Sequence, residues 1–411
     1  MHIGIAGPIA TRDVRALLDD ASTPLPAGTE GAPLLATIMA ELLRRGHRVS
    51  AFTLSADLPL DDAAGVVARG RSFELHYVPC RRRAWPFNGW RPGRIVDLYS
   101  FERRGLQRAM AAAAPAVIHA HWAYEYAWAA MRTGIPNVVT CHDSPVAVAR
   151  FERDLRHGGY RWLRAGMAWH VLRHARRVTT VSPYMADQVE SLCRVPVSVV
   201  PNPITERGEP AAPAAPTAGP GLLMVFNGWG ARKNAAAGLR AFALLRGQIP
   251  GAELHLYGHD TQEGGAAWRW WRDQGESGGI AFHGAVAHDA LIDAMRASDL
   301  MLHPALEESF GAVLAEAMSV GLPVVAGARS GAVPWVVGDA GMLVDVTRPQ
   351  AMADAMLAVL ADPAAARAMG QRGRERVRAN FSTGAVVGRY EHEYALALGQ
   401  GWTPSMRSEM A

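Results

Sequence analysis

Two glutamates in the second half of the chain have residue types and a spacing that could bind a polar ligand. Glu308 and Glu316 lie within the run HPALEESFGAVLAEAMSVGLPVVA. A small turn of Ser309, Phe310 and Gly311 follows the first glutamate, and an apolar segment that we expect to be helical carries the second. If the whole stretch is helical, eight steps of about 1.5 Å place the second glutamate two turns on, roughly 12 Å along the axis.

Carboxylates at that separation could hold the two ends of an extended ligand with hydroxyl groups at both ends. The backbone N–H groups at the start of a helix have no partner within the helix and can bind an anion. A nucleotide-sugar has this layout, with sugar hydroxyls, a diphosphate and ribose hydroxyls in line. The alternative is an ordinary amphipathic helix with a solvated Glu316.

A glycine-rich segment, FNGWGARKNAAAGLRAF, carries Lys233, the single lysine of the chain. Gly228 and Gly230 allow the backbone to approach a ligand closely. Since every other fixed cation is arginine, Lys233 could be the position that needs a compact ammonium, which acts on phosphate as a point charge. Arg232 could supply a second cation, or backbone amides could complete the site. The alternative is a plain surface turn.

Alternating strands and helices must position these residues. Strands separated by helices predict a parallel sheet with helices on both faces, and ligands of such sheets bind at the carboxyl ends of the strands. Polar residues at those ends are candidates for a ligand site, although a buried histidine can simply satisfy backbone groups; they are His119, His121, His142, Asp143 and Asn202. The strands expected in the first half are His2–Ala6, Val49–Leu54, Val117–His121, Val138–His142, Val178–Val181 and Val197–Val200, with a helix over Leu34–Arg45.

A stretch rich in Pro and Ala, residues 205–220, divides the chain and predicts an exposed linker between domains 1–204 and 221–382. A final helix is expected at about 383–398. The second domain repeats the strand–helix alternation. Its expected strands are Leu222–Phe226, Glu253–Tyr257, Ile280–His283, Leu300–His303 and Leu322–Val325, and its expected helices include Ala235–Leu245 and Ala287–Ala297.

Length and composition are those of a globular protein of two or more domains, with 411 residues, 49% apolar and 19% charged. No apolar run is long enough for a spanning helix. The start, MHIGIAG, reads as a strand and not as a secretory signal. The three cysteines, Cys80, Cys141 and Cys193, have no metal-ligand spacing, so we expect no metal site and a reducing, cytoplasmic setting.

Arginines mixed with aromatic residues form two clusters in the first half. Residues 71–110 include the run Arg81–Arg83 with Trp85, Phe87 and Trp90 nearby, and a second cluster runs from Arg150 to Arg177. Such surfaces can bind anionic lipid headgroups or acidic acceptors, so we expect peripheral contact with the inner face of a membrane. The alternative is a solvated face. We find no nucleic-acid-binding motif and expect no nucleic acid partner.

The region around the two glutamates resembles the E-x7-E motif of retaining nucleotide-sugar glycosyltransferases, above all family 4. HP precedes the motif, SFG lies inside it and EAMSVGLPVVA ends it. The resemblance implies an α/β protein of GT-B architecture, with two Rossmann-like domains facing each other across a cleft. It implies that the first domain binds the acceptor, the second binds the donor, and the last helix packs back on the first domain.

Other segments resemble the family less closely. His142 in VVTCHDSP is similar to a segment whose histidine lies near the reacting sugar, and VIHAHW is similar to another family segment. Gly31 is our choice for the glycine of the loop after the first strand. The chain departs from the family at Gly228, where the phosphate loop usually has arginine, and at Trp335, where a glutamate is usual.

The resemblance implies a retaining hexosyltransferase that needs no metal or other cofactor and serves cell-envelope or polysaccharide synthesis. Its partners would be a nucleotide-sugar donor and a glycan, lipid-linked or small-molecule acceptor. Glu308 would hold the sugar hydroxyls and Glu316 the ribose, while Lys233 and Arg232 would stabilise the departing diphosphate. Three alternatives stay open: a nucleotide-sugar epimerase of the same fold, a phosphorylase, for which the pyridoxal lysine is lacking, and a non-catalytic binding module. A dehydrogenase is disfavoured because no G-x-G-x-x-G opens either domain.

Overall fold

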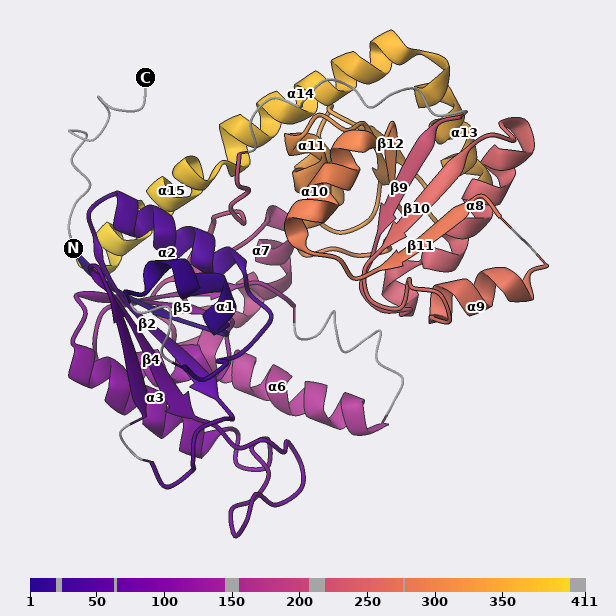
Figure 1. Cartoon of the computed structure of the whole chain (residues 1–411). Helices are drawn as coiled ribbons and strands as arrows, with labels where there is room; N and C mark the ends of the chain where they lie inside the picture. The colour runs from indigo at the N-terminus through magenta and orange to yellow at the C-terminus, as the bar shows by residue number, and fades with distance from the viewer. Residues whose placement is uncertain (20–23, 63–64, 145–154, 207–218, 276–277, 400–411) are drawn as a thin grey trace. The chain divides into compact units, whose positions relative to one another are not determined.

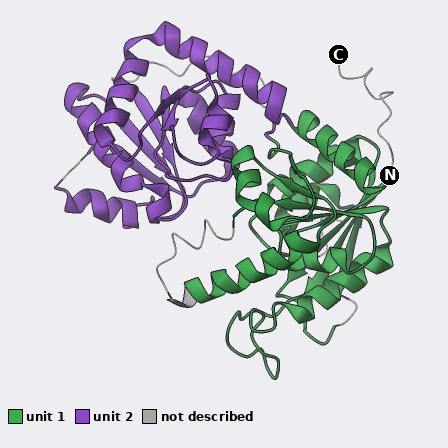
Figure 2. Cartoon of the chain, turned by 180° about the vertical axis from the view of Figure 1, so that it is seen from behind, with its two compact units in different colours: residues 1–203, 383–411 green, residues 204–382 purple. Residues whose placement is uncertain are grey.

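The computed structural model describes residues 1–19, 24–62, 65–144, 155–206, 219–275 and 278–399. The chain forms two compact units (Figure 2). Unit 1 combines Met1–Pro203 with Thr383–Ala411, and unit 2 is Ile204–Ser382. Most of the expected linker, and the start of the second arginine cluster, lie outside the described residues.

Unit 1 is built on an eight-stranded sheet in the order β3-β4-β2-β1-β5-β6-β7-β8. Its strands are parallel except for the antiparallel pair β3 and β4, which the sequence analysis missed. The two strands of that pair are joined by a tight turn in which Ser72 has a positive φ of 59°. The strands are β1 His2–Ala6, β2 Arg48–Ser55, β3 Val66–Gly70, β4 Phe73–Pro79, β5 Val117–His121, β6 Asn137–Cys141, β7 Val178–Thr180 and β8 Val197–Val199.

Helices cover both faces of this sheet, with α2 and α15 on one side and α3 and α6 on the other (Figure 1). The apolar positions of α2 recur at helical spacing, so Leu35, Ile38, Met39 and Leu42 are all buried against the sheet. The helices are α1 Thr11–Val14, α2 Leu34–Arg44, α3 Ser100–Ala113, α4 Glu125–Met131, α6 Leu155–His174, α7 Pro183–Val189 and α15 Thr383–Ala397, with 3-10 turns η1 Arg15–Leu17 and η2 Glu190–Leu192.

The last helix, α15, is part of unit 1 although it follows unit 2 in the chain. Val386, Val387, Tyr390 and Tyr394 join the core formed by α2 and the first strands. At the rim, Glu391 accepts from Arg45 Nη1 at 2.7 Å and lies 2.7 Å from His47 Nε2. The core of unit 1 is therefore completed by a helix that follows unit 2 in the chain.

Unit 2 has a six-stranded parallel sheet in the order β11-β10-β9-β12-β13-β14. The strands are β9 Gly221–Val225, β10 Glu253–Tyr257, β11 Ile280–Gly284, β12 Leu300–His303, β13 Val324–Gly327 and β14 Met342–Val344. The helices are α8 Ala235–Gln248, α9 Ala266–Asp273, α10 His288–Ala297, α11 Ala312–Ser319, α12 Val333–Val337, α13 Pro349–Ala361 and α14 Pro363–Phe381, with the 3-10 turn η3 Ala231–Lys233. Helix α8 packs on α13, and α11 packs on α14.

Each unit has its own core of buried aliphatic and aromatic side chains. The strands of unit 2 read as nearly continuous apolar runs because both faces of a parallel sheet are covered. Among the described residues, no helix combines the length and the apolar character needed to cross a bilayer.

Candidate active site

In unit 2, an acid–base cluster forms where the loop after β12 meets η3. Lys233 Nζ donates to Glu308 Oε1 at 2.6 Å, and Arg232 Nη1 lies 3.7 Å from Glu308 Oε2. Arg232 Nη1 also donates to the backbone oxygen of Glu307 at 3.0 Å. The structure thus brings Arg232, Lys233 and Glu308 together, although 75 positions separate Lys233 from Glu308.

The backbone around Lys233 is fixed by Asn234 and by a glycine turn. Asn234 Nδ2 donates to the backbone oxygens of Pro304 at 3.0 Å and Val346 at 2.8 Å. Gly228 has a φ of +80°, which residues with a side chain rarely adopt. The loop is therefore tied to the carboxyl ends of the strands, where ligands of such sheets bind.

Burial raises the pKa of Glu308, but its contacts with His303 and Lys233 outweigh that effect and hold the pKa at about 2. Burial raises the pKa of the neighbouring Glu307, and Arg232 only partly offsets this. The two adjacent glutamates therefore differ: Glu308 is a carboxylate at any ordinary pH, whereas Glu307 takes up a proton more readily. Neither Glu307 nor His303 was among the site residues expected from the sequence.

Helix α11 begins later than the sequence analysis expected. Gly311 takes a left-handed conformation, with a φ of +87°, and the helix starts at Ala312. Glu308 is thus in the loop and Glu316 is just over one turn into the helix, so the 12 Å separation of a continuous helix does not apply. Phe310 is buried against the rings of Trp335 and Phe381, which anchors the turn.

Glu316 lies on α11 with part of its side chain exposed. Its Oε1 is 2.9 Å from His288 Nε2 at the start of α10. Ser309 belongs to the same loop as Glu308 and is partly buried. The side-chain contact of Glu316 is thus with His288 and not with Lys233 or Glu308.

In unit 1, the predicted strand-end histidines are fully enclosed. His121 Nδ1 lies 2.8 Å from His142 Nε2, and His119 is hydrogen-bonded to Thr140 Oγ1 at 2.6 Å and Tyr394 Oη at 2.8 Å. The ring centroids of Trp122 and His142 lie 4.3 Å apart, with the ring planes tilted by 31°. The three histidines therefore form one connected group at the ends of β5 and β6.

Burial lowers the pKa of all three histidines. That of His142 falls to about 3, although the Asn202 side chain favours the charged form. His119 and His121 are lowered well below the ordinary histidine value by burial and by neighbouring histidines. These imidazoles are neutral at pH 7, so His142 can donate or accept a hydrogen bond but carries no charge.

Asp143 lies beside this group and faces a cavity of about 470 Å³ in unit 1. Its Oδ1 accepts from Tyr124 Oη at 3.1 Å. Gly28 lines the same cavity, whereas the predicted Gly31 is exposed and outside its lining. A side chain at Gly28 would put a Cβ 2.3 Å from the backbone oxygen of Ile9, so this close approach requires glycine.

The cavity lining includes residues that the sequence analysis did not assign to a site. They come from loops and helices far apart in the chain, so no local motif marks them; they include Arg94, Tyr99, Trp122, Tyr124, Glu125 and Arg164. Arg94, Tyr99 and Arg164 belong to the arginine- and aromatic-rich stretches, whereas Trp122, Tyr124 and Glu125 lie outside them.

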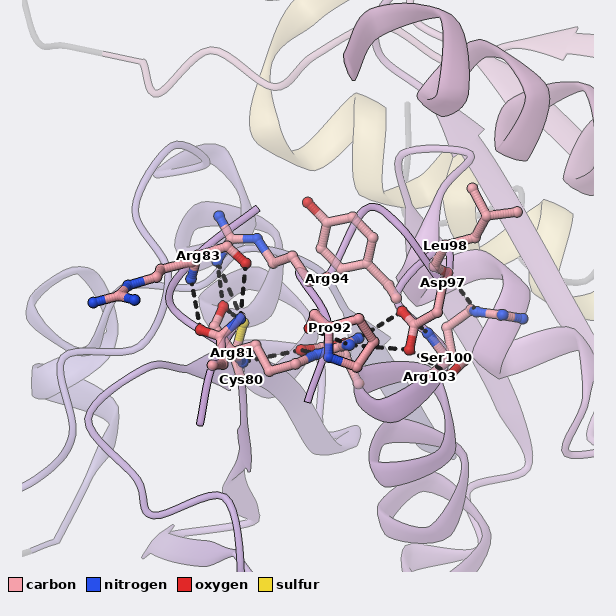
Figure 3. Close-up of polar contacts among 12 residues, drawn as sticks. Cys80, Arg81, Arg83, Pro92, Arg94, Asp97, Leu98, Ser100 and Arg103 are labelled. Carbon is pink, nitrogen blue, oxygen red and sulfur yellow. Dashed lines mark hydrogen bonds and ion pairs between the residues drawn. The ribbon is translucent and has the colours of Figure 1, made fainter. Parts of the chain in front are cut away.

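The first arginine cluster is not a uniform surface. Arg81 is 1% exposed, and its Nη2 donates to Glu102 at 2.6 Å. The same nitrogen donates to Asp97 at 2.7 Å (Figure 3). The expected contact of Arg81 with lipid is therefore wrong, because two carboxylates already neutralise it in the interior. Arg82, Arg83 and the nearby aromatic side chains remain on the surface.

Comparisons with known proteins agree with this architecture. The family model "Glycosyltransferase Family 4" matches residues 34–207, and the model "Glycosyl transferases group 1" matches residues 219–362. Together they cover most of both units. The chain belongs to the family 4-like nucleotide-sugar glycosyltransferases of the GT-B fold, and it is a glycosyltransferase.

Individual relatives match either a short segment of this chain or its whole fold at low sequence identity. N-acetyl-alpha-D-glucosaminyl L-malate synthase of Bacillus anthracis is 40% identical over 108 residues, which is 26% of this chain and 28% of that relative. Sucrose-phosphate synthase of Thermosynechococcus elongatus is similar in fold, with a TM-score of 0.74 at 21% identity over 97% of this chain and 99% of the other. HepE of Anabaena, solved with UDP and glucose, gives a TM-score of 0.63 at 17% identity over 95% and 98%.

Proposed function

We propose that this glycosyltransferase moves a sugar from a nucleotide diphosphate to an acceptor hydroxyl and keeps the anomeric configuration of the donor. The observation that carries the proposal is the cluster of Lys233, Arg232 and Glu308, with Glu316 on the following helix. It offers two cations for a diphosphate and two acids for hydroxyl groups. Unit 2 would bind the donor and unit 1 the acceptor.

Leaving-group departure is the step that this cluster can assist. When the bond between the sugar C1 and the diphosphate oxygen breaks, negative charge grows on that oxygen. Lys233, Arg232 and the free N–H groups at the start of α11 would stabilise it. Lys233 is paired with Glu308, so the donor must share or displace this contact.

The acceptor hydroxyl would attack C1 on the same face as the departing diphosphate. A bond forms between the acceptor oxygen and C1, and the acceptor proton passes to a departing phosphate oxygen. Glu308 would align the sugar through its hydroxyls, and Glu316 would hold the ribose. His142, neutral at pH 7, would serve the reaction only through hydrogen bonding.

Nucleotide binding tests the donor site. The purified protein would be heated with UDP, GDP, ADP, CDP or dTDP, beginning with UDP because HepE was solved with it. A ligand that binds only the folded state raises the melting temperature. We expect one nucleotide to do so, and Glu316→Gln to weaken its binding about tenfold, the usual size for one charge-assisted hydrogen bond.

Glu375→Gln is the matched control, because Glu375 is an exposed acid of unit 2 on α14 that contacts only Gln371 in the described structure. It should bind the nucleotide as the parent does. The donor site would be refuted if the parent protein bound no nucleotide, or if Glu316→Gln and Glu375→Gln lost nucleotide affinity equally. Either result would favour a binding module of another kind.

Transfer from the donor so identified tests the reaction itself. Because two fixed cations face the proposed diphosphate position, we propose that no metal is required, and activity should persist in excess EDTA. Proton NMR of the product should show the anomeric configuration of the donor. Inversion, or epimerised free sugar without transfer, would contradict the retaining mechanism or favour the epimerase.

We also propose that unit 1 contacts an anionic membrane surface through two exposed aromatic groups. Phe87 and Trp90 in the loop after β4 are 62% and 80% exposed, and Trp162 and Trp169 on α6 are 63% and 51% exposed. Trp162 and Trp169 are two turns apart and share one face of the helix. Arginines nearby would meet lipid phosphates, and the rings would enter the headgroup layer.

Sedimentation with vesicles of phosphatidylglycerol and phosphatidylcholine tests this surface. The double variant Trp90→Ser and Trp162→Ser should lose most of its binding, while Leu244→Ser, at an exposed apolar position in unit 2, should not. Equal binding by both variants, or no binding by the parent protein, would refute the contact. Arg81 is left intact, because its buried ion pairs make it structural.

A further inference from the structure

We propose that the cavity of unit 1 selects an acceptor of monosaccharide size that carries a carboxylate or phosphate group. This inference rests on the proposed function, since it names the acceptor class of the same enzyme. The cavity of about 470 Å³ is near the lower end of the range for small-molecule sites. One sugar ring with its substituent therefore fits better than an extended chain.

The lining holds three arginines and three carboxylates, and ion pairs engage two of those carboxylates. Arg164 is paired with Glu125 at 3.1 Å, and Glu30 is paired with Arg12, which lies outside the lining, at 3.0 Å. Arg94, Arg161 and Asp143 are the remaining charged residues of the lining. Among the described residues, no carboxylate lies within ion-pair distance of either of these two arginines.

Arg94 is oriented by the backbone without being neutralised. Its Nη1 donates to the carbonyl oxygens of Arg81 at 2.6 Å and Arg82 at 3.1 Å (Figure 3). Its Nε is buried and has no hydrogen-bond partner among the described residues. A partly buried charge is stabilised by a counter-ion, which an anionic ligand in this cavity would supply.

Two aromatic residues of the lining hold an unfavourable backbone conformation. Trp122 has a φ of +65° and Tyr99 a φ of +61°, a region that bulky residues rarely occupy. Such conformations are unfavourable, and positions of this kind gather at ligand sites. Both residues line the cavity, and an aromatic ring suits the C–H face of a sugar ring.

The hydroxyl groups of the lining are already ordered for polar recognition. Arg164 Nη1 reaches Tyr99 Oη and Tyr160 Oη, both at 3.4 Å, and the two tyrosines are hydrogen-bonded at 2.9 Å. The Arg164 guanidinium also stacks on the Tyr124 ring at 3.7 Å. Asp143 is fixed by Tyr124, so its carboxyl can accept from a sugar hydroxyl while Arg161 and Arg94 meet the anion.

Calorimetric titration of the full chain, saturated with its nucleotide, tests this assignment. The probes are glucuronate, glucose 6-phosphate and glucose, which share a ring and differ in charge. We expect at least one anionic probe to bind at least tenfold more tightly than glucose, with weaker binding at high salt. The tighter anion identifies the carboxylate or the phosphate as the group recognised.

Arg161→Gln is the decisive variant, because Arg161 makes no hydrogen bond to a described residue and its loss should leave the fold intact. The preference for the anionic probe should fall about tenfold. Arg173→Gln, on the same helix but outside the cavity lining, should keep the parent's preference. Near-UV circular dichroism of both variants verifies the fold.

Two results would overturn the inference while the proposed function stands. In the first, the parent protein binds its nucleotide but binds glucose as tightly as the anionic probes, or binds none of the three probes. The other is an anionic preference that survives in Arg161→Gln. Failure of the parent protein to bind any nucleotide would instead contradict the proposed function.

Discussion

At the scale of single residues, the sequence identified the acids and cations but not their pairing. Glu308 and Lys233 were expected at neighbouring parts of a ligand, one on the sugar and the other on the diphosphate. In the structure they form a direct ion pair, and the pKa of Glu308 is about 2. The two charges neutralise each other, so a donor that used both groups would share or displace this contact.

The buried histidines give a prediction about acid stability. Their pKa values lie below the ordinary value of about 6.5, so below that pH the unfolded state binds protons that the folded state does not. These histidines should therefore leave the free energy of unfolding unchanged above pH 6.5 and lower it as the pH falls below that value. Between pH 6.5 and its own lowered pKa in the folded state, each of these three histidines would lower the free energy of unfolding by about 1.4 kcal/mol per pH unit.

Denaturant unfolding at pH 7.5, 6.0 and 5.0 measures this slope. His142→Gln should reduce it by about one proton, whatever its effect on stability at pH 7.5. His174→Gln, at an exposed position on α6, should leave the slope unchanged. An identical slope in His142→Gln and the parent protein would show that His142 is protonated in the folded state.

At the scale of elements, most strands and helices could be predicted, and the exceptions have local causes. The β3–β4 pair was missed; in β3 only one residue, Ala68, is buried, so the strand carries a weak apolar signal. Helix α11 begins at Ala312 because Gly311 adopts a left-handed conformation that ends the preceding turn. Both departures depend on backbone geometry that the hydrophobic pattern does not report.

Helix α15 gives a prediction for packing, because its buried face completes the core of unit 1. Tyr390 is fully buried, and its ring packs on those of His119 and Tyr394. Tyr390→Ala should lower the free energy of unfolding of unit 1 by about 3–5 kcal/mol, as for other large aromatic side chains removed from a core.

Differential scanning calorimetry, which can resolve the transitions of two domains, measures this loss. Arg389→Ala is the matched control, since Arg389 is the exposed neighbour on the same helix. It should change stability by less than about 0.5 kcal/mol. A small effect of Tyr390→Ala would mean that α15 contributes little to the core of unit 1.

At the scale of the whole molecule, the chain is divided into two units with separate cores. The residues that we assign to the donor all lie in unit 2, whereas the cavity that we assign to the acceptor lies in unit 1. The chain leaves unit 1 at Pro203 and returns to it at Thr383. Each half of the proposed reaction can therefore be tested by binding before any transfer is measured.

The sequence by itself determined the α/β class, most of the strands and the motif around Glu308 and Glu316. These features are local, because apolar periodicity and short motifs depend on neighbouring residues. Only the tertiary structure decided that Arg81 is buried, that Lys233 pairs with Glu308, and that Arg94 and Arg161 share a cavity with Asp143. Burial and charge pairing join residues far apart in the chain, and the packed fold alone sets which of them meet.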